Sequence, residues 1–141
     1  MKEALIRFEG EAFYAVKWHD CLRDIGFRVS GGGAEKAVYA SNGNNLILES
    51  EGFVMRQAQQ GYEWKLKLMQ TRRWEGFIKF YSVLLAAFAM PQNVNVTIAD
   101  DVFYDPQTLK NHAENIVISE FSTDELIDNG AYRTGEGIRF V

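Results

Sequence analysis

The sequence predicts a single α+β domain, residues 1–141, in which a mainly antiparallel, curved sheet packs on a central apolar helix. One observation is the alternation of apolar and charged residues in 62–70, typical of a half-buried strand. Another is the helical spacing of apolar residues in 74–89. The third is that a chain of 141 residues, 47% of them apolar, suits one domain with one core.

The N-terminal part is expected to form a strand and then an amphipathic helix. Residues 4–8, ALIRF, are rich in large apolar side chains. From residue 11 the apolar residues recur at intervals of three and four, and Gly26 follows the last of them as a left-handed cap. This pattern predicts a helix over 11–25, followed by a short extended piece at 27–29. The apolar face of the helix comprises Tyr14, Trp18, Cys21, Leu22 and Ile25.

Residues 37–70 predict a meander of antiparallel strands. Asn42-Gly43 between apolar runs is a strong hairpin signal, and Gly52 and Gly61 separate the later runs. In the last strand the residues Tyr62 to Leu68 alternate so that the aromatic and aliphatic side chains face one side and the charged ones the other. The expected strands are 37–41, 46–50, 53–59 and 62–70.

The most apolar helix is expected at about 74–89, packed on the inner face of the meander. Its apolar stripe is broad enough to be buried on much of its circumference, and Pro91 ends it. The stripe consists of Trp74, Phe77, Ile78, Tyr81, Leu84, Leu85 and Phe88.

The C-terminal third alternates between strand and helix signals. Residues 93–99 alternate as a strand, and Asp105-Pro106 starts a helix that runs to about 115. Residues 115–121 fit either a continued helix or a strand, and their β-branched run favours a strand. The STDE sequence at 122–125 is a capping box before a short helix. Residues 137–141, GIRFV, are expected to form an edge strand.

Charge is unevenly distributed along the chain. The net charge is −4, which excludes a nucleic-acid binder by overall composition. Residues 53–81 hold 6 basic and 2 acidic side chains, whereas 82–141 hold 3 basic and 9 acidic ones. Cys21 is the only cysteine, acidic residues stand where a signal peptide needs an apolar run, and the longest apolar stretch is too short to cross a bilayer. These features predict a soluble cytoplasmic protein.

The glycine run Gly31-Gly32-Gly33 is the first candidate for chemistry. A phosphate-binding loop needs a helix directly after the glycines. Residues 34–41 leave little room for one before Asn42-Gly43, and the spacing matches neither GxxxxGK[ST] nor GxGxxG. We therefore interpret the run as a mobile hinge, with residues 34–41 extended.

Other candidate catalytic or metal-ligating residues are weaker. The acidic cluster of Asp100, Asp101 and Asp105 lacks calcium-loop spacing, and Asp105 is already expected to cap a helix. His19 and His112, both expected on polar helix surfaces, form no zinc motif with Cys21. No nucleophile motif is present, so we expect neither an enzyme nor a cofactor or metal.

The basic middle of the chain carries the main hypothesis of function. Lys65 and Lys67 lie on the outer face of their strand, with Arg56 expected beside them and Arg72 and Arg73 at the strand's end. We expect a small non-catalytic binding protein that presents this charged surface to a macromolecular partner, in the manner of an accessory, inhibitor or immunity-type protein. The partner is expected to be another protein.

Two alternatives stay open. The first is a small-molecule binder or enzyme with an aromatic-lined pocket between the sheet and the 74–89 helix. The second is nucleic-acid binding through the basic 56–73 face, which is disfavoured because the strand's aromatics face the other way from its lysines. The GIRFV edge also suggests a homodimer. The pocket-lining candidates are Trp18, Tyr62, Trp64, Trp74 and Tyr81.

Overall fold

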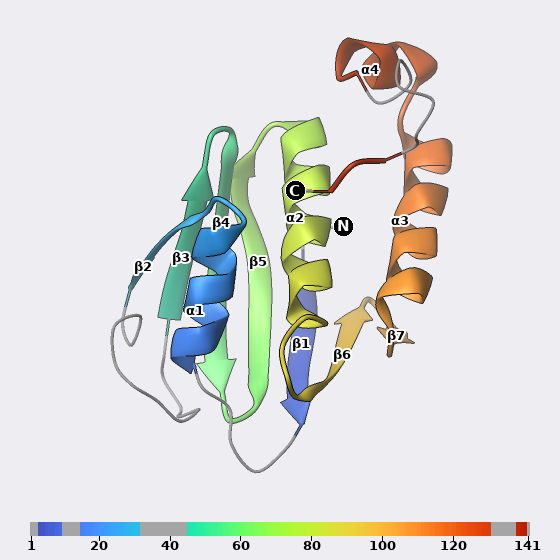
Figure 1. Ribbon diagram of the computed structural model, residues 1–141. Coiled ribbons are helices and arrows are strands. Elements are labelled where there is room, and N and C mark those ends of the chain that lie inside the picture. Colours follow the sequence, from blue (N-terminus) through green and yellow to red (C-terminus); the bar gives the residue numbers. More distant parts are fainter. Residues whose placement is uncertain (1–2, 10–14, 32–44, 131–137, 141) are drawn as a thin grey trace.

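The computed structural model describes residues 3–9, 15–31, 45–130 and 138–140. They form one α+β domain in which four helices pack on a seven-stranded antiparallel sheet with the strand order β2-β3-β4-β5-β1-β6-β7 (Figure 1). The elements along the chain are β1 (Glu3–Glu9), α1 (Ala15–Asp24), β2 (Arg28–Gly31), β3 (Asn45–Ser50), β4 (Phe53–Gln60), β5 (Glu63–Thr71), α2 (Arg73–Ala87), β6 (Asn93–Ile98), β7 (Asp101–Phe103), α3 (Pro106–Glu120) and α4 (Thr123–Asp128).

The N-terminal strand β1 lies inside the sheet. It pairs with β5 on one side and with β6 on the other, so that Ile6 is opposite both Trp64 and Val96. Its alternating side chains are therefore buried on the helix side and exposed on the other. This placement joins the meander β3-β4-β5 to the C-terminal hairpin β6-β7 in one sheet.

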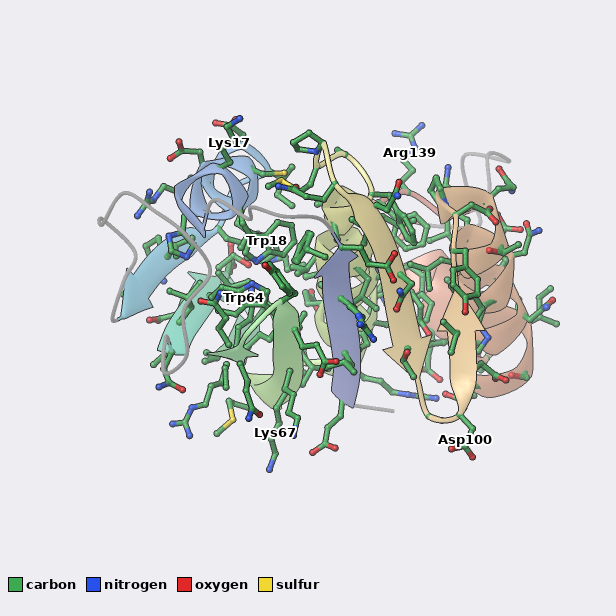
Figure 2. The ribbon with its side chains drawn as sticks, turned by 90° about the horizontal axis from the view of Figure 1, so that it is seen from below. Lys17, Trp18, Trp64, Lys67, Asp100 and Arg139 are labelled. Atoms are coloured by element: carbon green, nitrogen blue, oxygen red, sulfur yellow. The ribbon has the colours of Figure 1, made fainter. Side chains whose placement is uncertain are left out.

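The helices cover one face of the sheet and leave the other face open. In Figure 1, α1 lies over the β3–β4 side and α2 over β5 and β1, with α3 beside α2. Figure 2 shows Lys17 on the helix side and Lys67 pointing away from the opposite face of the sheet. The core lies between the two layers. Its largest fully buried side chains are Trp18, Trp64, Phe8, Phe53 and Phe80.

Local sequence signals set the helix ends. Gly26 follows α1 with φ 106°, a conformation that glycine adopts without strain. The backbone N–H of Thr108 donates to Asp105 Oδ1 at 2.9 Å, which caps α3. A reciprocal capping box between Ser122 and Glu125 starts α4. Gly130 follows α4 with φ 77°.

Much of the expected fold is confirmed. The strands expected at 4–8, 46–50, 53–59, 62–70 and 93–99 correspond to β1, β3, β4, β5 and β6. The central helix, expected at 74–89, begins one residue earlier and ends at Ala87. The described part of the helix expected at 11–25 is α1, whose Trp18 and Leu22 are fully buried.

The strand expected at 115–121 is wrong, because these residues continue α3 to Glu120. Leu109, Ala113 and Val117 are buried at helical spacing, and they place one face of α3 against the rest of the core. The β-branched run costs a helix only a few tenths of a kcal/mol per residue, which this burial outweighs. Ile118, the last residue of that run, is 79% exposed.

The expected edge strand at 137–141 is also wrong for the residues that the structure describes there. Ile138 to Phe140 belong to no strand, and Phe140 packs on the helix side with its ring centroid 6.5 Å from that of Tyr81. The described edges of the sheet are β2 and β7. The expected extended piece at 27–29 overlaps β2 at residues 28–29, and β7 was not expected. Association with a second copy stays a prediction.

Several expectations lie outside the described residues. These are the strand at 37–41, the Asn42-Gly43 turn and the extended 34–41 segment. Gly31 ends β2, and the other two glycines of the expected hinge are also outside the described part. In the described part of the chain, no helix is both long enough and apolar enough to span a membrane.

Candidate functional site

Three of the five predicted basic residues gather on the open face of the sheet. Arg56 on β4 lies directly opposite Lys67 on β5, and the next pair on that face is Ala58 opposite Lys65. All three cations are exposed. We call Arg56, Lys65 and Lys67 the basic trio. The alternation read from the sequence predicted that the two lysines share this face, and the β4–β5 register adds the arginine.

The basic trio lines the β4–β5 side of a groove of about 640 Å³ on the open face. Leu5 on β1 lies opposite both Lys65 and Thr97, so the groove extends across β4, β5, β1 and β6. Leu5, Ala58 and Ala99 give it an apolar floor, and Glu3 is its one carboxylate among the described lining residues. The site thus combines one positive side with apolar surface.

The charges of the basic trio are not compensated within the described chain. No described acidic group lies within ion-pair distance of Arg56, Lys65 or Lys67, although Glu3 is the register partner of Lys67. Like charges directly opposite each other on neighbouring strands destabilise a sheet. The Arg56–Lys67 pair therefore acts against folding at this position, whereas Glu3, opposite Lys67 on β1, acts in the other direction.

Ala99, which also lines the groove, has a strained backbone. It is the first residue of the two-residue loop between the paired residues Ile98 and Asp101. Its φ is 54°, the one positive value among the described residues other than glycine. This conformation favours glycine in such hairpin loops and costs an alanine about 1–2 kcal/mol. Sequence reasoning missed Ala99, since no local motif marks it.

The other two predicted basic residues lie away from the basic trio. Arg72 precedes α2, and its guanidinium is 3.7 Å from Glu75 and 4.0 Å from Glu51. Arg73 donates from Nη1 to both carboxylate oxygens of Glu125 at 2.8 Å. It also donates to the main-chain oxygen of Glu120 and lies over the Phe121 ring. Both arginines therefore have acidic partners within the chain, unlike the basic trio.

Two of the five predicted pocket aromatics fill the core. Trp18 and Trp64 are fully buried between α1 and the sheet, where Figure 2 labels them. Trp18 Nε1 donates to Gln57 Oε1 at 3.1 Å, and its ring packs edge-on against Phe8 at 5.4 Å between centroids. Tyr62 is 43% exposed in the turn between β4 and β5. The structure therefore does not bring these three residues to one cavity.

The remaining two aromatics belong to a cluster between α2 and α3. Trp74 packs edge-on against Phe121, and Tyr81 contacts Phe77 at 4.9 Å between ring centroids. Tyr81 and Phe77 line a cavity of about 380 Å³ beside the end of β5. Burial, together with the nearby charge of Glu120, raises the pKa of the Tyr81 hydroxyl. Of the five predicted pocket residues, only Tyr81 lines this cavity, which also involves α3, an element that the sequence did not indicate for the pocket.

The two histidines were expected on polar surfaces, and neither lies there. His19 is fully buried next to Trp18 because α1 covers the sheet with a wide face, and its ring lies 6.3 Å from that of Trp64. His112 is half-buried, with its ring 4.9 Å from Phe103.

Burial, followed by the charge of Asp24, raises the pKa of the Cys21 thiol, as for an inert core cysteine.

The acidic cluster has no metal-binding arrangement in the described structure. No group of three or more histidine, cysteine or carboxylate side chains that could hold a metal ion exists among the described residues. Asp105 caps α3 as expected, and Asp101 begins β7.

Comparison with known proteins adds no functional assignment to this geometry. The chain matches no protein-family model, no curated protein and no solved structure.

Proposed function

We propose that this chain is a non-catalytic binding protein whose basic trio docks onto the acidic surface of another protein. The observation that carries the proposal is the set of three exposed cations without ion partners in the described structure, two of which lie directly opposite each other. An acidic partner supplies the missing counter-charges and removes the repulsion between Arg56 and Lys67. Accessory, inhibitor and immunity-type proteins are roles that such a surface suits.

The apolar floor of the groove supports a protein as the partner. Interfaces between proteins have an apolar centre with polar and charged residues around it. Leu5, Ala58 and Ala99 supply apolar surface beside the three cations. The strained conformation of Ala99 is a further cost to stability at the same place, and such costs concentrate at functional sites.

The open face favours a protein over a single-stranded nucleic acid. Sequence-tolerant binding of single strands needs aromatic side chains on which bases stack. The described strands place every aromatic residue on the helix side of the sheet, as Trp64 shows between Lys65 and Glu63. The net charge of −4 also repels a polyanion at long range.

A charge-reversal pull-down tests the proposal. The tagged wild-type chain is compared at low salt with Lys65→Glu/Lys67→Glu and with a control, Lys17→Glu/Lys110→Glu. The control makes the same change in net charge on exposed lysines of α1 and α3. Captured proteins are identified by mass spectrometry and then tested individually for binding with purified components.

The expected result is an acidic protein that binds the wild type and the control but binds Lys65→Glu/Lys67→Glu at least about 10-fold more weakly, with an affinity that falls as salt rises. Equal binding by all three forms would show that the basic trio is not the contact. Capture that nuclease treatment abolishes would replace the proposal with nucleic-acid binding.

A further inference from the structure

Four of the ten residues that line the cavity between α2 and α3 are aromatic. Phe77, Phe80 and Tyr81 come from α2, and Phe121 follows the end of α3. The Phe77 and Phe121 rings meet at 63° with their centroids 5.2 Å apart. The cavity volume of about 380 Å³ exceeds the roughly 150 Å³ of an engineered apolar cavity that binds benzene. It therefore has room for a small organic molecule.

The aromatic cluster already stabilises one cation. The guanidinium carbon of Arg73 lies 4.4 Å from the centroid of the Phe121 ring. Aromatic rings attract cations through the negative potential above their faces. The charge of Arg73 is compensated by the carboxylate of Glu125, to which it donates two hydrogen bonds at 2.8 Å.

Glu120 leaves an uncompensated negative charge at the cavity. Its carboxylate is exposed and forms no ion pair or hydrogen bond with the described residues, since Arg73 contacts only its main-chain oxygen. The field of this carboxylate reaches the cavity, because after burial it is the second cause of the raised pKa of Tyr81. The two charged residues of the lining are Arg73 and Glu120. Because Arg73 is paired with Glu125, which lies outside the lining, the carboxylate of Glu120 is the lining charge that has no ion partner among the described residues.

From the aromatic lining, the bound guanidinium and the free carboxylate, we propose that the cavity between α2 and α3 binds a small organic cation with an alkylated ammonium group. The ammonium methyls contact the rings of Phe77 and Phe121, and the carboxylate of Glu120 compensates the charge from the mouth. Aromatic surroundings with a nearby carboxylate are suited to quaternary ammonium groups, whose charge is spread over apolar methyls. This site is separate from the basic trio, because it lies on the helix side of the sheet.

Titration with choline and its uncharged isostere 3,3-dimethylbutan-1-ol tests the proposal. The two probes have the same shape, and only choline carries a charge. Chemical shifts of the backbone amides and of the Phe77, Tyr81 and Phe121 rings are followed by NMR. The larger cation benzyltrimethylammonium is titrated in parallel. A trimethyl-lysine peptide distinguishes a free ligand from a modified protein side chain.

Choline is expected to bind saturably with shifts confined to α2, α3 and Phe121, and at least about 5-fold more tightly than the alcohol. Glu120→Gln is expected to weaken choline binding about 3-fold or more, whereas Glu114→Gln on the same helix but outside the lining leaves it unchanged. Both substitutions are at exposed positions, so the variants keep the fold. Phe77→Leu is expected to weaken the binding of choline more than the binding of the alcohol.

Three results would each overturn the proposal. One is the absence of saturable shifts for both choline and benzyltrimethylammonium. Another is equal affinity for choline and the alcohol, which would make the site apolar without charge selectivity. The third is a Glu120→Gln variant that binds choline as the wild type does. Tighter binding of the trimethyl-lysine peptide than of choline would support the proposal and assign a modified protein as the source of the cation.

Discussion

Ala99 is a single residue whose backbone costs stability. Its φ of 54° lies in the left-handed region. There the Cβ atom of an alanine is crowded by the backbone, whereas glycine, which has no Cβ atom, is not strained. We expect Ala99→Gly to raise the free energy of unfolding by about 0.5–1 kcal/mol, because relief of strain exceeds the added entropy of the unfolded chain. Equilibrium unfolding in urea measures this change.

A matched control separates strain from the general effect of glycine. Ala58 is an interior residue of β4, where all non-glycine residues have negative φ. Ala58→Gly is therefore expected to lower the free energy of unfolding by about 0.5–1 kcal/mol. If Ala99→Gly lowers the free energy of unfolding as Ala58→Gly does, the backbone at residue 99 is not strained.

Trp18 and Gln57 form the buried polar contact that joins α1 to β4. Trp18→Phe leaves the Gln57 amide without its donor and creates a cavity, so we expect a loss of about 2–4 kcal/mol in the free energy of unfolding. The double variant Trp18→Phe/Gln57→Leu is expected to recover part of that loss, since it removes both polar partners. Thermal and urea unfolding of the two variants test this coupling, and equal stabilities would contradict it.

At the scale of elements, Arg73 and Glu125 connect the start of α2 to α4. The pKa of Glu125 is lowered mainly by the hydrogen bond from the Ser122 backbone and also by Arg73, while burial acts in the opposite direction. A lowered pKa in the folded state means that the ionised form stabilises α4. This stabilisation is present above the ordinary carboxyl pKa and is lost as the pH falls through the lowered value.

We therefore expect α4 to lose helicity on acidification before the sheet unfolds. Helical secondary shifts of Thr123–Asp128, recorded by NMR from about pH 6 to about pH 2.5, measure this loss. Glu125→Gln is expected to make α4 less helical at neutral pH and to remove most of its pH dependence, whereas Asp124→Asn keeps the wild-type response. An α4 signal in Glu125→Gln that still follows the wild-type titration would assign the effect to another group.

The elements also show what local sequence could predict. Alternation predicted β5 with its outward lysines, and the capping signals at Asp105 and Ser122 predicted two helix starts. Residues 115–121 could not be assigned from local sequence. The β-branched residues there favour a strand, but the burial of Val117 against other elements stabilises the helix more. The short β7 gave no periodic signal and is held by its pairing with β6.

At the scale of the whole molecule, both candidate sites depend on long-range placement. The insertion of β1 between β5 and β6 brings Leu5 and Thr97 next to Lys65, and no local pattern indicates that order. The aromatic cavity likewise needs Phe121 to pack against Phe77 on another helix. Two of the five predicted pocket aromatics, Trp18 on α1 and Trp64 on β5, are core residues because they lie between the helix and the covered face of the sheet.

On the open face, the charge that is proposed to bind a partner also affects the stability of the fold. Arg56 lies opposite Lys67 on one side and Ile47 on the other, so Arg56→Glu converts a like-charge pair into an opposite-charge pair without creating a new repulsion directly across the strand. We expect this variant to raise the free energy of unfolding by about 0.2–1 kcal/mol at low salt and by less at high salt.

The same variant is expected to lose the acidic partner that the basic trio captures. Urea unfolding at two salt concentrations and the pull-down of purified partner are therefore performed on one protein. Arg28→Glu is the control. Arg28 is also exposed on the open face, but it lies 3.7 Å from Glu49. The same charge reversal therefore breaks an ion pair there and is expected to lower the free energy of unfolding. Two results would contradict this view of the basic trio as a set of charges that lower stability and serve binding. One is a lower free energy of unfolding for Arg56→Glu. The other is a higher free energy of unfolding together with unchanged binding of the partner.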